Sequence, residues 1–331
     1  MSDSEQNEAP QYFGQNILDE PAKEALPLSN KKSPFLILLI LSFLVLGGIL
    51  VSTGLTFAVG YGLGYDAIQM RKVLGGDATA ADATFLRLAL FMQHLFLFFF
   101  PAAITLWICY KQKALEAAAL DKRPLSISVV LGVFWLIVSM GFIQYSYQIN
   151  KAFPLPNWMM ANEDNVKKTM DTLFSLKGFA GAFVNTLLIG VMPAISEELL
   201  FRGVIQRQLG RLLHNDHAQV WITAAIFSAI HFQFQGFLPR MILGALLGYM
   251  LVWSRSLWVP VAAHAFNNGI QVLALYAMNM KPEDMEKLEE GKDIHWTIGG
   301  ASLMIMLIVG KYFREKHEKE FMPKTTNTEG T

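Results

Sequence analysis

The sequence predicts an all-α membrane protein, a polytopic bundle of about eight transmembrane helices. Of its 331 residues, 53% are hydrophobic and 16% are charged, and the mean hydropathy is +0.35. Soluble domains carry about 25% charged residues, so a water-soluble globular fold is disfavoured. The chain also contains repeated apolar runs close to the ~20 residues that a helix needs to cross ~30 Å of hydrocarbon.

Charge and cysteine content argue against two further classes of protein. Lys and Arg (27) balance Asp and Glu (27), so no basic surface suggests a nucleic-acid partner. Cys109 is the single cysteine, which leaves no intramolecular disulfide and favours a buried thiol. The polar start, Met1 to Lys32, lacks the layout of a cleaved signal peptide, so we expect an uncleaved first span.

Four segments are expected along the chain. Residues 1–33, rich in Gln, Asn, Glu, Asp and Pro, are predicted to be a disordered cytoplasmic tail. Residues 34–177 hold N-terminal transmembrane helices and an interfacial loop, 178–280 hold the helices with the candidate site, and 281–331 hold an acidic loop, a last transmembrane helix and a basic cytoplasmic tail. The expected spans are Phe35–Tyr61, Phe85–Tyr110, Leu125–Tyr145, Gly178–Phe201, Val220–Phe234, Phe237–Trp253, Leu257–Met278 and Ile294–Tyr312. The fifth is short and is joined to the sixth through Gly236.

The distribution of lysine and arginine predicts the orientation. These residues are concentrated in the N-terminal tail, in the loops after spans two, four and six, and in the C-terminal tail. By the positive-inside rule, both termini face the cytoplasm. In the loop after span three, apolar residues recur at helical spacing from Trp158 to Phe174, which predicts an amphipathic helix at the outer interface, with a solvated loop helix as the alternative.

The first motif of interest is Ser196-Glu197-Glu198-Leu199-Leu200-Phe201-Arg202-Gly203. Ionisable groups at membrane depth cost at least a few kcal/mol and need a reason. Glu198 and Arg202 are four residues apart, which suits an ion pair on one helix face, whereas Glu197 points ~100° away. An ordinary ion pair at a helix end near the headgroups is the simpler alternative. Pro193 just upstream is expected to bend the helix and open room for water.

Two histidine motifs follow. Phe227 precedes His231 by one turn in span five, and His264 precedes Asn268 by one turn in span seven. Each pair has a simple structural interpretation: a packed histidine in the first case, and two polar groups that satisfy each other in the second. In span two, Gln93 and His94 are expected to make an interhelical hydrogen bond. Together the three motifs supply a carboxylate, an arginine, two histidines and an amide, which are the groups that water-activating hydrolysis requires.

In this order, Glu-Glu-x-x-x-Arg, Phe-x-x-x-His and His-x-x-x-Asn resemble the three signature motifs of the CPBP family of CAAX prenyl endopeptidases and bacteriocin-processing or immunity membrane proteins. The resemblance covers about residues 178–275, and all three motifs match without substitution. It implies an integral-membrane endopeptidase in a plasma (cell inner) membrane that cleaves a membrane-associated peptide or protein. It does not establish that this substrate is lipidated.

The resemblance also implies roles for individual residues. Glu197 would activate water with His231 as its partner, and His264 and Asn268 would form the oxyanion hole or hold the scissile carbonyl. Glu198, Arg202 and Phe227 would support them. A divalent metal such as zinc is left open, with Glu197, His231 and His264 as its candidate ligands. The soluble His-Glu-x-x-His arrangement is absent from the sequence.

Two other functions compete with the protease. One is a non-catalytic immunity or scaffold membrane protein that keeps the polar cluster for assembly or partner binding. The other is a proton-coupled transporter, because intramembrane carboxylates and histidines also build proton relays. The sequence has no visible repeat symmetry, which argues mildly against the transporter.

Overall fold

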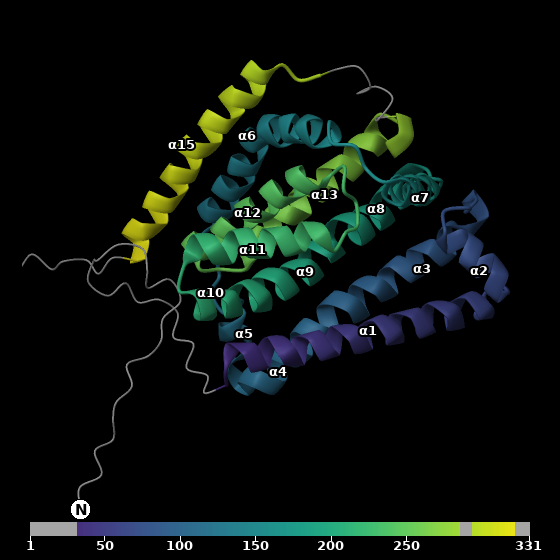
Figure 1. The fold of residues 1–331 in the computed structure, drawn as a ribbon, viewed down its shortest axis with the longest axis horizontal. Coiled ribbons are helices and arrows are strands. Elements are labelled where there is room, and N and C mark those ends of the chain that lie inside the picture. The colour runs from purple at the N-terminus through teal and green to yellow at the C-terminus, as the bar shows by residue number, and fades with distance from the viewer. Residues whose placement is uncertain (1–31, 285–292, 322–331) are drawn as a thin grey trace, which may run out of the picture.

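The computed structural model describes residues 32–284 and 293–321, and within these ranges every regular element is a helix (Figure 1). This confirms the predicted all-α class. Most of the predicted N-terminal tail (1–31), much of the acidic loop (285–292) and the end of the C-terminal tail (322–331) lie outside the described residues.

Six helical segments of the described chain are long and apolar enough to cross a membrane, and the protein is an integral membrane protein. They correspond to six of the eight expected spans: Pro34–Gly62, Ala80–Ala117, Ser126–Lys151, Gly178–Leu213, Phe237–Ser254 and Trp296–Lys319. The expected fifth and seventh spans are also helices, α11 (Asp216–Ala229) and α13 (Trp258–Ala277). With 14 residues, α11 is about 21 Å long, too short to cross ~30 Å of hydrocarbon. The polar motif His264 to Asn268 lowers the hydropathy of α13.

Two of the spans are composite. The second contains η1 (Ala80–Asp82), α3 (Ala83–Gln93), the π-helical η2 (His94–Phe99), α4 (Phe100–Tyr110), η3 (Lys111–Lys113) and α5 (Ala114–Ala117). The fourth contains α8 (Gly178–Asn185), the π-helical η4 (Thr186–Val191), α9 (Met192–Glu198), the π-helical η5 (Leu199–Gln206) and α10 (Arg207–Leu213). The remaining helices are α1 (Pro34–Gly62), α2 (Ala67–Leu74), α6 (Ser126–Lys151), α7 (Asn157–Leu173), α12 (Phe237–Ser254) and α15 (Trp296–Phe321).

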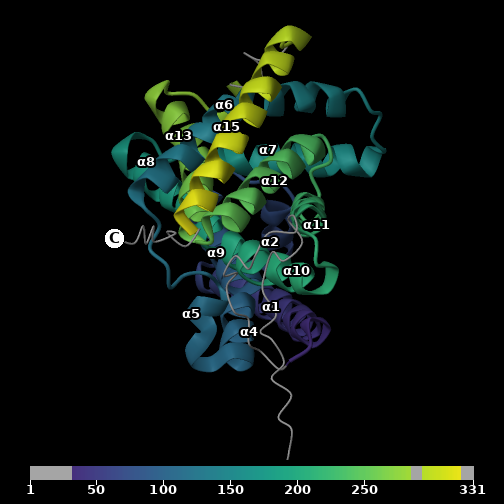
Figure 2. The ribbon, with the colours of Figure 1, turned by 90° about the vertical axis from the view of Figure 1, so that its left-hand side faces the viewer.

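The helices that carry the three motifs lie in the middle of the bundle. In Figures 1 and 2, α1 and α4 lie below α9 and α10, while α6 and α15 lie on the opposite side of α12 and α13. The α6–α15 contact is fixed by Trp135, whose indole N–H donates to the Met306 carbonyl at 2.8 Å. These layers cover α9, α12 and α13 from two sides, and charged side chains between them, such as Glu198 and Arg202, are fully buried. Ionisable groups interact strongly at such positions.

The fourth span is longer than the sequence predicted. We expected it to end near Phe201, but the helix continues through Gly203 to Leu213, which disfavours the alternative of a helix end at the headgroup level. The reason is that Arg202 is fully buried against other helices instead of marking an end, and that the polar side chains of Gln206 and Arg207 beyond it are buried as well. Glu197 therefore lies near the middle of a 36-residue helix.

The predicted amphipathic helix after span three is confirmed as α7, residues Asn157–Leu173. Hydrogen bonds link α7 to the rest of the bundle; in one of them the Glu163 carboxylate accepts the backbone N–H of Gln235 at 3.0 Å. Glu163 is only 6% exposed, so this face of α7 is packed on protein. The position of α7 at the outer membrane interface stays a prediction.

Candidate active site

Glu198, Arg202 and His264 form one hydrogen-bonded cluster in the middle of the bundle. Arg202 Nη1 on η5 donates to Glu198 Oε1 on α9 at 2.8 Å. His264 on α13 places Nδ1 at 2.8 Å from the same oxygen. The Glu198 and Arg202 side chains are 0% exposed and that of His264 is 3% exposed. Charges so far from water are tolerable only because they are paired and hydrogen-bonded.

This cluster decides which nitrogen of His264 carries hydrogen. An ionised carboxylate only accepts hydrogen bonds, so His264 Nδ1 is the donor to Glu198. In the neutral ring, Nε2 is then left with a lone pair. Arg202 also anchors the cluster to α12, because its Nη2 donates to the Gly244 carbonyl at 2.9 Å.

The carboxylate of Glu197 lies between two histidines. Its Oε2 is 4.0 Å from His264 Nε2, and its Oε1 is 3.9 Å from His94 Nδ1. Glu197 is 5% exposed. Both separations exceed a direct hydrogen bond, but two polar atoms ~4 Å apart can hydrogen-bond one water between them. The pair of Glu197 Oε2 and His264 Nε2 is therefore suited to holding a water molecule.

His231 lies in a turn, not inside a helix. We expected it within a span running to Phe234, but α11 ends at Ala229. The His231 ring donates from Nδ1 to the Phe227 carbonyl at 2.7 Å, because a carbonyl can only accept. The unsatisfied carbonyls of the last helical turn explain this contact. His231 Nε2 is left as the nitrogen that can accept a hydrogen bond.

Phe227 packs against both histidines and the arginine. Its ring centroid lies 4.9 Å from that of His231 and 6.0 Å from that of His264. The Arg202 guanidinium carbon lies 4.7 Å from the same ring centroid, in cation–π range. Phe227 is 2% exposed. Phe227, which belongs to the second motif, thus contacts residues of all three motifs.

The turn that carries His231 is tied to α6 by Asn150. The Asn150 amide donates to the Phe234 carbonyl at 2.7 Å and accepts from the Leu238 N–H at 2.8 Å. Asn162 of α7 adds a hydrogen bond to the Phe232 carbonyl at 2.9 Å. Residues before position 178 therefore hold the second motif in place.

Asn268 lies one turn beyond His264 on α13, and its amide faces the fourth span. Its Nδ2 is 3.5 Å from the Ile189 carbonyl, and its Oδ1 accepts from the Asn267 amide at 2.9 Å. Pro193 has no N–H to donate to the Ile189 carbonyl four residues earlier, which leaves this oxygen open to another donor. The structure thus brings His264 next to Glu197 and Asn268 next to Ile189. An oxyanion role for Asn268 stays a prediction.

Two of the π-helical segments, η2 and η4, stand just before a proline. η2 ends two residues before Pro101, and η4 ends two residues before Pro193. Since proline cannot complete the turn that precedes it, a wider turn accommodates the missing hydrogen bond. We expected Pro193 to bend the helix; in the structure the wide turn lies immediately upstream of it. Such turns are frequent at functional sites.

The close approach of η4 to α13 depends on a glycine. A Cβ at Gly190 would lie 3.0 Å from Gly269 Cα, tighter than ordinary packing, whereas one at Gly269 would meet Thr186 Cγ2 at 3.6 Å. We expect Gly190→Ala to lower the free energy of unfolding by about 1–3 kcal/mol through overpacking. Gly269→Ala at the same interface is the matched control, expected to be neutral or stabilising by up to about 1 kcal/mol. Unfolding in detergent micelles measures both, and equal losses would contradict the packing account.

The residue that sequence reasoning missed is His94. We expected it to make an interhelical hydrogen bond, and its Nδ1 is indeed 3.4 Å from the Ser196 hydroxyl of α9. Its position beside Glu197 was not foreseen. The sequence does show that His94 is a polar residue in an apolar span, seven positions before Pro101, which marks it as a candidate site residue. The sequence does not say which helix His94 faces.

The three candidate zinc ligands do not form a metal cluster. Within residues 32–284 and 293–321, no group of three or more His, Cys, Asp or Glu side chains is arranged to hold a metal ion. Glu197 and His264 approach each other, but their nearest atoms are 4.0 Å apart, whereas tetrahedral zinc with ligands at ~2.0–2.2 Å brings neighbouring donors closer. Metal dependence stays a prediction, which cleavage measured after chelation would test.

Comparison with known families agrees with the motifs. Residues 179–270 match the model of a family described as Rce1-like, type II CAAX prenyl endopeptidase. This confirms the resemblance over the part of the chain that carries all three motifs. The matched range excludes His94 and the helices before α8.

One curated protein is similar over nearly the same length of chain. The uncharacterized protein YpbD of Bacillus subtilis (strain 168) is 34% identical over 96 residues, which cover 28% of this chain and 44% of YpbD. The chain thus matches less than half of that relative. No solved structure matches this chain.

Proposed function

We propose that this protein is an integral-membrane endopeptidase that hydrolyses a peptide bond of a membrane-associated substrate. The observation that carries the proposal is the distance of 4.0 Å between Glu197 Oε2 and His264 Nε2 in a buried cluster. The other ring nitrogen of His264, Nδ1, is held by Glu198. A carboxylate and a lone-pair nitrogen at this separation can orient one water by two hydrogen bonds. A water held in this way lies within hydrogen-bond reach of Glu197, as general-base catalysis requires.

The chemistry follows from this arrangement. Glu197 removes a proton from the water, and the oxygen attacks the scissile carbonyl carbon. The proton on Glu197 then passes to the leaving nitrogen as the C–N bond breaks, so water is consumed and one acid and one amine are released. We propose His231 as the partner of Glu197. The Phe227 carbonyl holds its Nδ1–H, which leaves Nε2 able to accept a hydrogen bond.

The oxyanion needs hydrogen-bond donors. We assign this role to Asn268 Nδ2, whose 3.5 Å contact with the Ile189 carbonyl is long and easily exchanged for a substrate oxygen. Nε2 of the neutral His264 ring carries a lone pair and cannot donate to the oxyanion, because Nδ1 holds the only ring hydrogen. We therefore assign His264 to orienting the water and Asn268 to the oxyanion.

The name of the matching family refers to prenylated CAAX substrates. We propose a lipidated tail as the narrower form of the substrate, because a bilayer-embedded site receives substrates that are already anchored in the membrane. We also propose the plasma (cell inner) membrane, with both termini cytoplasmic, on the basis of the lysine and arginine bias. Cleavage of one peptide with and without a prenyl thioether would separate the lipidated substrate from a purely peptidic one.

The direct test compares membranes from cells that express the wild type and Glu197→Gln at equal levels. Quantitative proteomics of membrane peptides should find fragments that the wild type releases and the variant does not. If both release the same fragments, Glu197 is not the base and the endopeptidase proposal fails. Expression of Glu197→Gln at the wild-type level is the control for folding.

A further inference from the structure

His94 lies outside the range that matches the family, yet it reaches Glu197. It is the first residue of η2, in the span Ala80–Ala117, and is 7% exposed. Its Nδ1 lies 3.4 Å from Ser196 Oγ and 3.9 Å from Glu197 Oε1. A histidine buried between two helices, with one nitrogen directed at a carboxylate, is in a position to hold that carboxylate.

The hydrogen bonds of Ser196 indicate which nitrogen of His94 carries hydrogen. Ser196 Oγ donates its single hydrogen to the Met192 carbonyl at 2.8 Å, four residues earlier in α9. Its oxygen can therefore only accept from His94, and Nδ1 is the donor. The N–H of His94 thus points to the oxygen-rich side of α9, where Glu197 Oε1 also lies.

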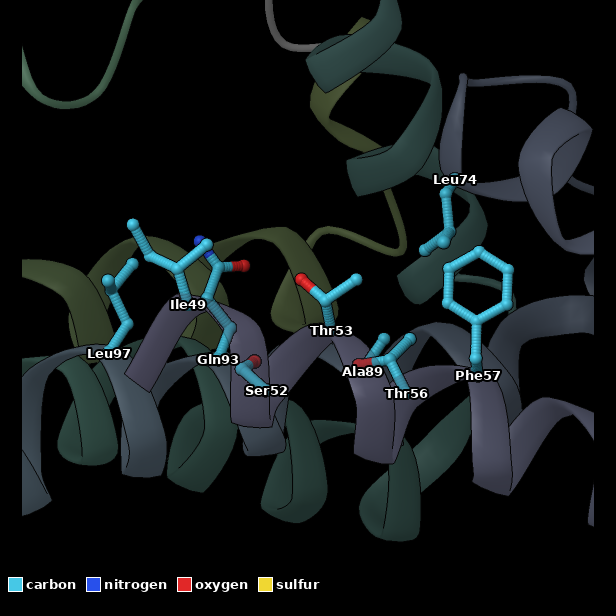
Figure 3. Close-up of a pocket in the computed structure, with 9 residues that line it drawn as sticks. All are labelled: Ile49, Ser52, Thr53, Thr56, Phe57, Leu74, Ala89, Gln93 and Leu97. Atoms are coloured by element: carbon cyan, nitrogen blue, oxygen red, sulfur yellow. The ribbon is translucent and has the colours of Figure 1, made fainter. Parts of the chain in front are cut away.

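The local packing keeps His94 on this side. A Cβ at Gly48 of α1 would collide with the Phe96 carbonyl of η2, so α1 and η2 are in backbone contact at the next turn. On the same side, Gln93 and Leu97 line a cavity of about 250 Å³ together with Ser52 and Thr56 of α1 (Figure 3). Gln93 and Leu97 thus face α1, whereas His94 faces α9.

We infer that His94 is a positioning residue for Glu197. It attracts Oε1 with the Nδ1–H that it shares between Ser196 Oγ at 3.4 Å and Oε1 at 3.9 Å, so that Oε2 is the oxygen presented to His264 and to the reacting water. The inference rests on the proposed endopeptidase function. It adds that the site is incomplete without the N-terminal helices, because residues 179–270 do not contain this contact.

Three substitutions test this inference on the full-length protein in proteoliposomes. The probe is a peptide that spans a cleavage site found in the fragment comparison. His94→Ala should lower kcat about 10- to 100-fold with little change in KM, because a carboxylate misplaced by ~1 Å loses most of its reactivity. His94→Asn should retain most of kcat, because its amide nitrogen occupies nearly the position of Nδ1. His94→Gln extends its amide to the level of Nε2 and should not restore kcat.

Gln93→Ala is the matched control, because it removes the neighbouring polar side chain on the cavity side. It should leave kcat within about two-fold, as expected for a group that contacts no reacting atom. A wild-type kcat in His94→Ala would overturn the inference. It would also be overturned if His94→Asn and His94→Gln lost kcat equally and in parallel with a loss of thermal stability. If Glu197→Gln is inactive while His94→Ala is fully active, only the inference fails; if Glu197→Gln is active, the proposed function fails.

Discussion

Arg202→Leu is expected to lower the free energy of unfolding by about 3–5 kcal/mol, because it leaves the buried Glu198 carboxylate without its charged partner. The ion pair is 2.8 Å long and both side chains are 0% exposed. The variant also loses the hydrogen bond to the Gly244 carbonyl and the guanidinium over Phe227. Unfolding in mixed micelles, followed by pulse proteolysis, measures the change.

The chain contains a matched control for this prediction. Arg314 and Glu318 of α15 form another pair four residues apart with the same 2.8 Å separation, but their side chains are 31% and 26% exposed. Arg314→Leu should cost only about 0–1 kcal/mol, because water screens an exposed pair. Adding Glu198→Leu to Arg202→Leu should recover part of the loss, since the unpaired charge is then removed. A double variant no more stable than Arg202→Leu would contradict this account.

Glu197→Gln is expected to lower kcat by about 10²–10⁴-fold, the usual contribution of a general base. KM should change little, because the amide keeps the size of the carboxylate and loses only the proton acceptor. The free energy of unfolding should also change little. The histidine contacts of Glu197 are 3.9 and 4.0 Å long, so no direct ion pair is broken. Steady-state cleavage and unfolding of the same preparation measure the two effects separately.

Glu198→Gln, at the neighbouring residue, should lower the free energy of unfolding, which Glu197→Gln leaves nearly unchanged. It weakens two contacts of 2.8 Å, to Arg202 and to His264 Nδ1, so stability should fall. If Glu197→Gln destabilises the protein as much as Glu198→Gln does, both carboxylates are structural. The assignment of Glu197 to water activation would then be wrong.

The class of the protein and most of its spans could be predicted because hydropathy is a property of local sequence. The first span, Phe35–Tyr61, differs from α1 by one residue at each end. The fourth span could not be delimited, because the charge of Arg202 mimics a helix end unless a partner such as the Gly244 carbonyl is known. His231 was placed inside a helix because the apolar stretch continues after Ala229, where α11 has already ended.

In the candidate site, too, contacts within one helix could be predicted and contacts between helices could not. The sequence by itself determined the Glu198–Arg202 pair, because residues four apart on a helix face each other whatever the surroundings are. Only the tertiary structure decided that His264 contacts Glu198 from 66 residues away. It also decided that His94 reaches Glu197 and that Gly190 lets α13 approach the fourth span. These contacts depend on the register and rotation of helices against one another. That register is set by close packing and by wide turns before proline, and no local pattern of the sequence specifies it.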